Sequence, residues 1–251
     1  MSGLEGKPVF ITGAGRGLGR STAMHLASMG AVLGVADIDG DNAKETAKLI
    51  ADAGGKASAF AFDASDQSAF HAAAADFAKS AGRIDAMVNN AAHLIYEPVE
   101  NVKPETLDLM LGAGFKSAVW GCQALLAHYD PDRGGAIVNY SSPVAFKGFP
   151  TTSIYSSIKA AVTGLTRTLS VELGPKNVRV NAVAPASVPT PGAKGNVSDE
   201  EYARRAANIP LRRNGREDDN YNAVAFLLSD EATFINGTVL HVDGGVVASG
   251  V

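Results

Sequence analysis

A tyrosine and a lysine stand four residues apart in Tyr155-Ser156-Ser157-Ile158-Lys159, shortly after Ser142. In a helix, residues at i and i+4 share one face, so the Lys159 ammonium would lie beside the Tyr155 phenol. A neighbouring cation lowers the pKa of a tyrosine from its usual value of about 10. With a pKa near neutrality, Tyr155 would act as a general acid or base towards an alcohol or carbonyl oxygen. An ordinary surface helix carries the same spacing by chance, so the interpretation needs support from the rest of the chain.

A glycine-rich segment near the amino terminus supplies that support. The apolar run Pro8-Val9-Phe10-Ile11 leads into Thr12-Gly13-Ala14-Gly15-Arg16-Gly17-Leu18-Gly19, and a helical pattern follows. A glycine turn between strand and helix lets the backbone approach a pyrophosphate, while the helix N-terminus offers N–H donors and a positive dipole end. The segment therefore predicts a dinucleotide site. The residues that it places against the cofactor are Gly13, Arg16, Gly17, Leu18 and Gly19.

The next strand-like run ends in a carboxylate, in Val35-Ala36-Asp37-Ile38. A carboxylate about 20 residues after the glycine turn accepts hydrogen bonds from the adenosine ribose hydroxyls. It repels a 2′-phosphate, so Asp37, with Ile38 beside it, predicts NAD rather than NADP. Arg16 argues weakly the other way, because a cation in the turn could meet that phosphate. Asp39 and Asp41 are better placed than Asp37 to cap the following helix.

Together these motifs, from about Leu4 to Gly245, resemble the compact, single-domain branch of the short-chain dehydrogenase/reductase family. Ser142, Tyr155 and Lys159 match the family's catalytic serine, tyrosine and lysine. The resemblance implies that Tyr155 exchanges a proton with the substrate oxygen and that Ser142 hydrogen-bonds that oxygen. Lys159 would lower the Tyr155 pKa and hold the nicotinamide ribose. Further cofactor contacts are implied at Asp63 and Ala64, at Asn90 and Ala91, and at Pro185, Val188 and Thr190.

One position departs from the family pattern. In register with Ser142, Gly114 stands where the family carries a fourth catalytic residue, an asparagine that holds a water of the proton relay. Glycine keeps the backbone carbonyl and removes the amide side chain. Because Gly112 and Gly114 both lie in a helical pattern, they predict a distorted or kinked helix.

Strand-like and helical patterns alternate along the whole chain. Strand-like runs lie near residues 8–11, 32–36, 57–62, 86–89, 136–140, 179–183 and 238–242, with helical patterns between them. This alternation predicts a single Rossmann-type, doubly wound α/β domain over residues 1–251. Its seven-stranded parallel sheet is flanked by helices on both faces. The Pro- and Gly-rich stretch that begins at Pro185 predicts a substrate lid near residues 185–210.

The substrate should meet the loops that follow the fourth, fifth and sixth strands, where ligands bind in such sheets. The candidate substrate contacts there are His93, Tyr96, Val144 and Phe149, with Ser142 and Tyr155 at the reacting oxygen. Apart from His93, these walls are apolar or aromatic and carry little positive charge. They indicate an uncharged, apolar or cyclic alcohol or ketone, and a merely exposed His93 is an equally good interpretation of that residue.

Composition narrows the class of protein further. The 251 residues are 46% hydrophobic and 19% charged, with a net charge of −4 that gives no basic surface for nucleic acid. The single cysteine, Cys122, excludes an internal disulfide and is typical of a reducing, cytoplasmic compartment. The five histidines lack ligand spacing, so no metal site is expected. We expect no membrane span, because no uninterrupted apolar run of about 18 residues occurs.

The combined prediction is an NAD-dependent alcohol dehydrogenase or ketone reductase. Two alternatives stay open: an NADPH-dependent 3-oxoacyl-thioester reductase and a non-catalytic NAD-binding regulatory protein. The resemblance also implies a homotetramer. Its two interfaces would use residues 105–128 with 154–173, and residues 222–228 with 238–241.

Overall fold

The computed structural model describes residues 1–190 and 197–249, in which seven parallel strands form one sheet. The strand order is β3-β2-β1-β4-β5-β6-β7. The strands are β1 (Pro8–Thr12), β2 (Val32–Asp37), β3 (Lys56–Ala61), β4 (Ala86–Asn89), β5 (Gly135–Tyr140), β6 (Val178–Pro185) and β7 (Val239–Val242). All seven coincide with the predicted runs to within a residue or two at each end. The predicted doubly wound α/β fold is therefore confirmed.

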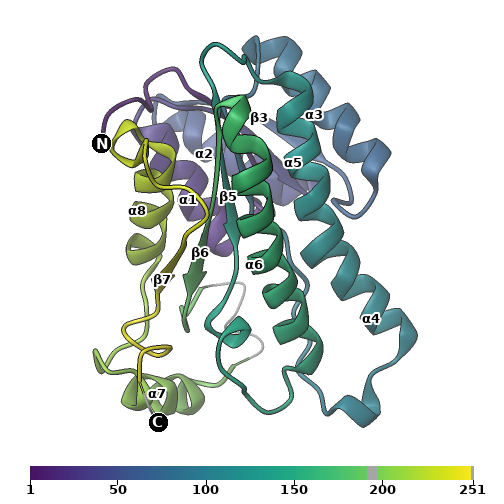
Figure 1. Ribbon diagram of the computed structural model, residues 1–251, viewed down its shortest axis with the longest axis vertical. Helices are drawn as coiled ribbons and strands as arrows, with labels where there is room; N and C mark the ends of the chain where they lie inside the picture. Colours follow the sequence, from purple (N-terminus) through teal and green to yellow (C-terminus); the bar gives the residue numbers. More distant parts are fainter. Residues whose placement is uncertain (191–196, 250–251) are drawn as a thin grey trace.

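Helices cover both faces of the sheet (Figure 1). The α-helices are α1 (Gly17–Ser28), α2 (Gly40–Asp52), α3 (Gln67–Ala81), α4 (Pro104–Leu111), α5 (Ser117–His128), α6 (Ser153–Leu173), α7 (Asp199–Asn208) and α8 (Glu217–Leu228). Helices α1, α2 and α8 form one layer, and α3, α5 and α6 form the other.

The central strands are apolar on both sides because each side is covered by a helical layer. Every residue of β1 is buried, and its alternate side chains enter two separate cores. Phe10 shows this arrangement well, since its ring lies 5.5–6.4 Å from four other phenylalanine rings on the α3 side of the sheet. Cys122 is buried in the same core, and burial raises its thiol pKa to about 12.

The position of the functional site follows from the strand order. The chain winds outward from β1 through β2 to β3, then returns to the other side of β1 at β4. This reversal makes the carboxyl ends of β1 and β4 the topological switch point, where ligands bind in open α/β sheets. Those ends point downward in Figure 1, towards α7.

The predicted helix distortion is present between α4 and α5, as the π-helical turn Gly112–Lys116. The Ser117 N–H donates to the Gly112 carbonyl five residues back, and the Ser117 hydroxyl donates to the Ala113 carbonyl at 2.5 Å. At Gly114, a Cβ would lie 2.8 Å from Cγ2 of Ile158 on α6. The space of the missing asparagine is therefore filled by an isoleucine.

We expect Gly114→Asn to destabilise the protein without raising turnover. The Ile158 methyl is fixed by β-branching, so the new side chain should overpack the site and lower the free energy of unfolding by about 1–3 kcal/mol. Denaturant unfolding and turnover of the one variant measure both effects. Gly164→Ala is the control, because it lies in α6 and a Cβ there meets nothing within 4 Å. Faster turnover at unchanged stability would instead indicate that the missing amide limits the proton relay.

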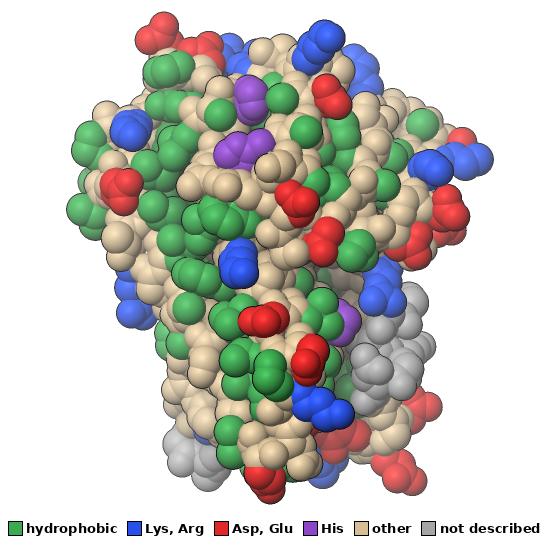
Figure 2. All heavy atoms as spheres, turned by 90° about the vertical axis from the view of Figure 1, so that its right-hand side faces the viewer, with side chains coloured by type: hydrophobic (Ala, Val, Ile, Leu, Met, Phe, Trp, Pro, Cys, Tyr) green, Lys and Arg blue, Asp and Glu red, His purple; other side chains and the backbone are tan. Residues whose placement is uncertain are grey.

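The continuous helix Pro104–His128 is long and apolar enough to cross a membrane by length and composition alone, with a mean hydropathy of 1.2. Half of that window is buried in the protein, where α5 packs on β4 and α3. Figure 2 views this side of the molecule, where hydrophobic side chains spread over the surface among scattered charges. Burial in the fold accounts for the apolar composition of the half of this window that packs inside the protein.

Candidate active site

The three candidate catalytic residues come together at the carboxyl end of β5. Ser142 follows β5, and both Tyr155 and Lys159 lie on α6, as the helical spacing predicts. Tyr155 shares a hydrogen bond with Ser142, and the Lys159 Nζ lies 5.7 Å from the centre of the Tyr155 ring. Ser142 and Lys159 are 7% and 3% exposed. A hydroxyl pair and an ammonium are thus held together in a largely dry site.

The electrostatics of this group differ from the prediction. Burial raises the pKa of Tyr155 above its ordinary value, Tyr96 adds to this effect, and the hydrogen bond from Ser142 only partly opposes it. Burial also lowers the pKa of Lys159 to about 8. The Lys159 Nζ donates to the Tyr140 carbonyl at 2.6 Å. The prediction of a lowered Tyr155 pKa is therefore wrong for this structure, because desolvation raises that pKa and Lys159, bound to the Tyr140 carbonyl, is not among the causes of the shift.

Ser141 fixes α6 against the end of β5. Its hydroxyl lies 2.8 Å from the Thr163 hydroxyl and donates to the Lys159 carbonyl at 3.3 Å. Both side chains are buried. Because Ser141 adjoins Ser142, these bonds set the position of Ser142 relative to Tyr155 and Lys159.

The glycine turn has the strand–turn–helix geometry that the sequence predicts. Asp37, at the end of β2, accepts from the Gly15 N–H at 2.8 Å and from the Asp39 N–H at 3.0 Å. A Cβ at Gly15 would lie 2.7 Å from the Asp37 carboxylate, so only glycine permits this approach. Asp39 caps α2 by accepting from two backbone N–H groups. Asp37 is therefore free of that capping role, as expected.

Asn90 connects the end of β4 to the glycine turn. Its side-chain amide donates to the carbonyls of Thr12 and Gly13, at 3.0 and 2.9 Å. The Thr12 hydroxyl in turn accepts from the N–H groups of Asn90 and Ala91, at 3.2 and 3.1 Å. These bonds tie the end of β4 to the glycine turn at the switch point.

The other candidate cofactor residues lie around the same edge of the sheet. Thr190 is buried, and a Cβ added to Gly17 would lie 3.3 Å from its hydroxyl. Arg16 precedes α1 and is exposed, and Leu18 is partly buried in the first turn of that helix. Ile38 and Asp63 are exposed after β2 and β3, whereas Val188 is buried after β6. Ala64 and Pro185 are partly buried.

The residues present fit a dinucleotide. Helix α1 begins at Gly17 with no acidic residue in its first turn, so its N-terminal dipole is open to a pyrophosphate. A side chain at Gly17 would occupy the space beside the Thr190 hydroxyl, which glycine leaves open. Among the described residues, no group of three or more metal-ligand side chains could hold a metal ion.

The candidate substrate contacts differ in their relation to Tyr155. The Tyr96 ring meets the Tyr155 ring edge to face, with centroids 5.9 Å apart. The Val144 N–H donates to the Ser142 hydroxyl at 3.4 Å, and Phe149 is exposed at the loop that precedes α6. His93 is exposed after β4. The predicted lid contains α7, while residues 191–196, with Pro191, Gly192 and Gly195, lie outside the described residues.

Sequence reasoning missed two groups of residues around the site. Arg20 shapes the glycine turn by donating to the Gly15 carbonyl at 2.8 Å, and it also pairs with Glu45. Tyr202 and Arg205 on α7 act electrostatically on Tyr96. The position of Arg20 at the end of the glycine motif could have indicated its role. Nothing in the local sequence relates α7 to Tyr96.

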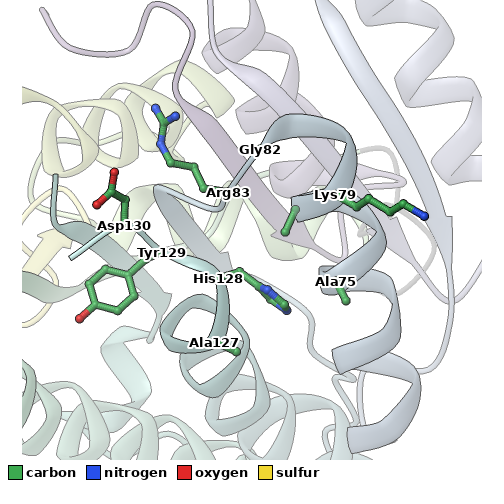
Figure 3. A pocket seen from close by; sticks show the side chains of 9 residues that line it. Ala75, Lys79, Gly82, Arg83, Ala127, His128, Tyr129 and Asp130 are labelled. Atoms are coloured by element: carbon green, nitrogen blue, oxygen red, sulfur yellow. The ribbon is translucent and has the colours of Figure 1, made fainter. Parts of the chain in front are cut away.

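A separate hollow lies at the opposite end of the sheet (Figure 3). This open groove of about 650 Å³ runs between the ends of α3 and α5. The Arg83 guanidinium beside it is paired with Asp85 at 2.6 Å. Two helix C-termini, which carry negative dipole ends, face the groove. It lies at the amino ends of β4 and β5, remote from Tyr155, and we do not include it in the active site.

Comparison with known proteins identifies the family. Residues 13–247 match the family model described as enoyl-(acyl carrier protein) reductase. The chain is 32% identical to a 3-oxoacyl-[acyl-carrier-protein] reductase of Thermotoga maritima, over 97% of this chain and 99% of that protein. It is 34% identical to an L-2,3-butanediol dehydrogenase of Corynebacterium glutamicum (96% and 98%) and 32% identical to a cyclopentanol dehydrogenase of Comamonas sp. (99% and 100%).

Solved structures agree along the whole chain. A short-chain dehydrogenase/reductase from Serratia marcescens superposes with a TM-score of 0.92 at 30% identity, covering 97% of this chain and 99% of the other. A 3-ketoacyl-(acyl-carrier-protein) reductase from Brucella melitensis complexed with NADH gives 0.90 at 31% (98% and 100%). A 7α-hydroxysteroid dehydrogenase complexed with NADH and 7-oxo glycochenodeoxycholic acid gives 0.92 at 31% (96% and 94%). The chain is therefore an oxidoreductase of the short-chain dehydrogenase/reductase family.

Proposed function

We propose that this protein interconverts a secondary alcohol and its ketone, with NAD as the cofactor. The observation that carries the proposal is the assembly of Ser142, Tyr155 and Lys159 after β5, at the same edge of the parallel sheet as the glycine turn after β1. The carbon skeleton of the substrate would be apolar or cyclic where it meets Tyr96, Val144 and Phe149. The relatives that act on butanediol and cyclopentanol support this reaction class.

Each residue has a distinct role in the proposed mechanism. Tyr155 takes the hydroxyl proton during oxidation and returns it during reduction, while Ser142 donates a hydrogen bond to the same oxygen. Asp37 would hold the adenosine ribose, Thr190 the nicotinamide end, and Lys159 the second ribose. The bound nicotinamide supplies the hydride acceptor or donor. Assays of secondary alcohols with NAD and NADP, followed by nicotinamide absorbance, test the proposal, which fails if no alcohol or ketone is converted.

Asp37 leads us to expect that NAD binds at least about tenfold more tightly than NADP, or about 1.4 kcal/mol. A 2′-phosphate would meet a carboxylate that already accepts two backbone hydrogen bonds. Calorimetric titration with both cofactors measures the difference. Asp37→Asn should reduce the difference between the NAD and NADP affinities. Asp41→Asn removes a nearby exposed charge on α2 and should leave this difference unchanged. Equal affinities in the unmodified protein would make Arg16 the dominant residue.

A second candidate function is the reduction of a 3-oxoacyl thioester with NADPH. The description of the matching family model and the similarity to acyl-carrier-protein reductases favour it. A preference for NADPH together with turnover of a 3-oxoacyl thioester would select this function. Turnover of any substrate would remove the further alternative, a non-catalytic NAD-binding regulatory protein.

The proposed assembly is a cytoplasmic homotetramer. We assign the protein to the cytoplasm because its single cysteine, Cys122, is buried. One interface would use α4 and α5 together with α6, and the other would use α8 together with β7. Leu109 and Val171 support the first interface, because they leave apolar side chains 47% and 78% exposed on α4 and α6. We expect a light-scattering mass about four times that of the 25.8 kDa chain at micromolar concentration. A mass near that of one chain would reject the tetramer.

A further inference from the structure

Tyr140 connects helix α1, at whose N-terminus a pyrophosphate would bind, with Lys159 on α6. It is the last residue of β5 and directly precedes Ser141 and Ser142. Its phenol oxygen lies 3.1 Å from the Thr22 hydroxyl on α1, and its main-chain carbonyl accepts from the Lys159 Nζ at 2.6 Å. Helices α1 and α6 cover opposite faces of the sheet (Figure 1). One residue therefore contacts an element of each helical layer.

The hydrogen bond between Thr22 and Tyr140 is closed off from solvent. Thr22 is 0% exposed and Tyr140 is 5% exposed, and the Tyr140 ring packs in the apolar core on the α1 side of the sheet. Within residues 1–190 and 197–249, neither hydroxyl has another side-chain partner. Burial raises the Tyr140 pKa to about 12, and the bond to Thr22 opposes this only in part, so the phenol keeps its proton at neutral pH. Because an unpartnered buried hydroxyl is costly, the pair holds the ring in one place.

The sheet supports the backbone of Tyr140 on one side only. Tyr140 pairs with Val183 on β6, whereas the pairing with β4 ends one residue earlier, where Asn139 lies opposite Asn89. The next residue, Ser141, is bound through its hydroxyl to α6. A strand ladder fixes the backbone only where a neighbouring strand is present. The phenol on α1 therefore supplies the support that β4 does not reach far enough to give.

The position of the Tyr140 carbonyl matters because it holds the Lys159 ammonium. It is the hydrogen-bond acceptor that the described residues provide for the Lys159 Nζ. Lys159 is 3% exposed, so its ammonium cannot turn towards bulk water instead. In the proposed function, this ammonium binds the second ribose of the cofactor. A displacement of about 1 Å in a positioned group can cost about a hundredfold in rate, so a small movement of the carbonyl has a large effect.

We propose that Tyr140 is a positioning residue, whose bond to Thr22 holds the Tyr140 carbonyl, and through it the Lys159 ammonium, in place for the nicotinamide ribose. The same bond joins α1 to Lys159, so that the two halves of the dinucleotide site keep a fixed relative position. This inference rests on the proposed function, because the cofactor is what gives the position of Lys159 its importance. Loss of the bond should weaken binding of the nicotinamide half and spare that of the adenosine diphosphate half.

The test compares NAD with ADP, which has the adenosine and the pyrophosphate but lacks the nicotinamide ribose. Calorimetric titration with both ligands is carried out on the unmodified protein, on Tyr140→Phe, on Thr22→Val and on the variant with both substitutions. We expect each of the three variants to raise the Kd of NAD about tenfold, or about 1.4 kcal/mol, and that of ADP less than about twofold. The two substitutions together should have no more effect on NAD than either alone, because they remove one and the same bond.

Two further variants complete the comparison. Thr22→Ser keeps a hydroxyl on α1 and should retain most of the NAD affinity. Tyr129→Phe makes the same change as Tyr140→Phe in the groove at the opposite end of the sheet, and it should alter neither Kd. The variant with both substitutions guards against misfolding, because it removes both hydroxyls with little change of shape and leaves neither of them buried without a partner.

Unchanged NAD affinity in the variant with both substitutions would overturn the inference, because the bond would then not be needed. An equal loss for NAD and ADP would also overturn it, because α1 alone would then be disturbed. If the unmodified protein does not bind NAD, the proposed function fails, and urea unfolding without cofactor decides the inference. The two substitutions should then shift the urea midpoint by different amounts in the unmodified and the Lys159→Met backgrounds. Equal shifts in both backgrounds would show that Tyr140 does not act on Lys159.

Discussion

Tyr155→Phe should lower turnover by about two to four orders of magnitude, the range that a positioned general acid or base contributes. The change deletes the hydroxyl that shares a hydrogen bond with Ser142 and keeps the ring that packs on Tyr96. NAD affinity should stay close to that of the unmodified protein, because only the proton carrier is lost. Steady-state kinetics and cofactor titration of the purified variant measure the two quantities. Retention of most activity would show that another group transfers the proton.

The pH dependence provides a second test of the same residue. Because burial raises the Tyr155 pKa, the phenolate needed for alcohol oxidation increases as the pH rises through the alkaline range. We therefore expect kcat/KM for oxidation to rise with pH and that for reduction to fall. Both slopes should flatten in the phenylalanine variant. Tyr129→Phe, the same substitution in the groove at the opposite end of the sheet, should leave both profiles unaltered.

The fold was predictable because its local patterns agree with each other. The central parallel strands are buried on both faces and are therefore short apolar runs, which the sequence displays directly. The glycine turn could be placed because it lies between such a run and a helix. The helix distortion could also be anticipated, since two glycines within three residues weaken a helix wherever they occur.

The pKa values of the site residues could not be predicted from the spacing of those residues in the sequence. The i, i+4 relation places Lys159 beside Tyr155 but does not reveal that Lys159 is 3% exposed and hydrogen-bonded to the Tyr140 carbonyl. Desolvation depends on everything packed around a group, and so do the pKa values. The same limit applies to the contact between the Tyr96 and Tyr155 rings, which joins segments far apart in the chain and is visible only in the fold.

Lys159→Met should abolish most turnover and, at pH 7, make the protein without cofactor more stable. Lys159 is buried, and burial lowers its pKa from 10.5 to about 8, so the fold bears the cost of a desolvated ammonium. A pKa difference of this size corresponds to at most about 3–4 kcal/mol. Methionine fills a similar volume without a charge, although it leaves the Tyr140 carbonyl without its donor. The expected gain at pH 7 is therefore about 1–2 kcal/mol of unfolding free energy.

The pH dependence separates this effect from simple repacking. At pH 7 the lysine is protonated in both the folded and the unfolded chain, and its full cost is present. Between about pH 8 and pH 10.5 the folded state releases the proton while the unfolded state retains it, so the stability of the unmodified protein rises relative to that of the variant. The advantage of Lys159→Met should therefore shrink across this window and be smallest above it. Urea unfolding at pH 7, 9 and 10.5, with equal chain concentrations, measures the difference. A variant that is less stable at pH 7, or one whose advantage does not change with pH, would show that the Lys159 ammonium is stabilised by its contacts more than burial penalises it.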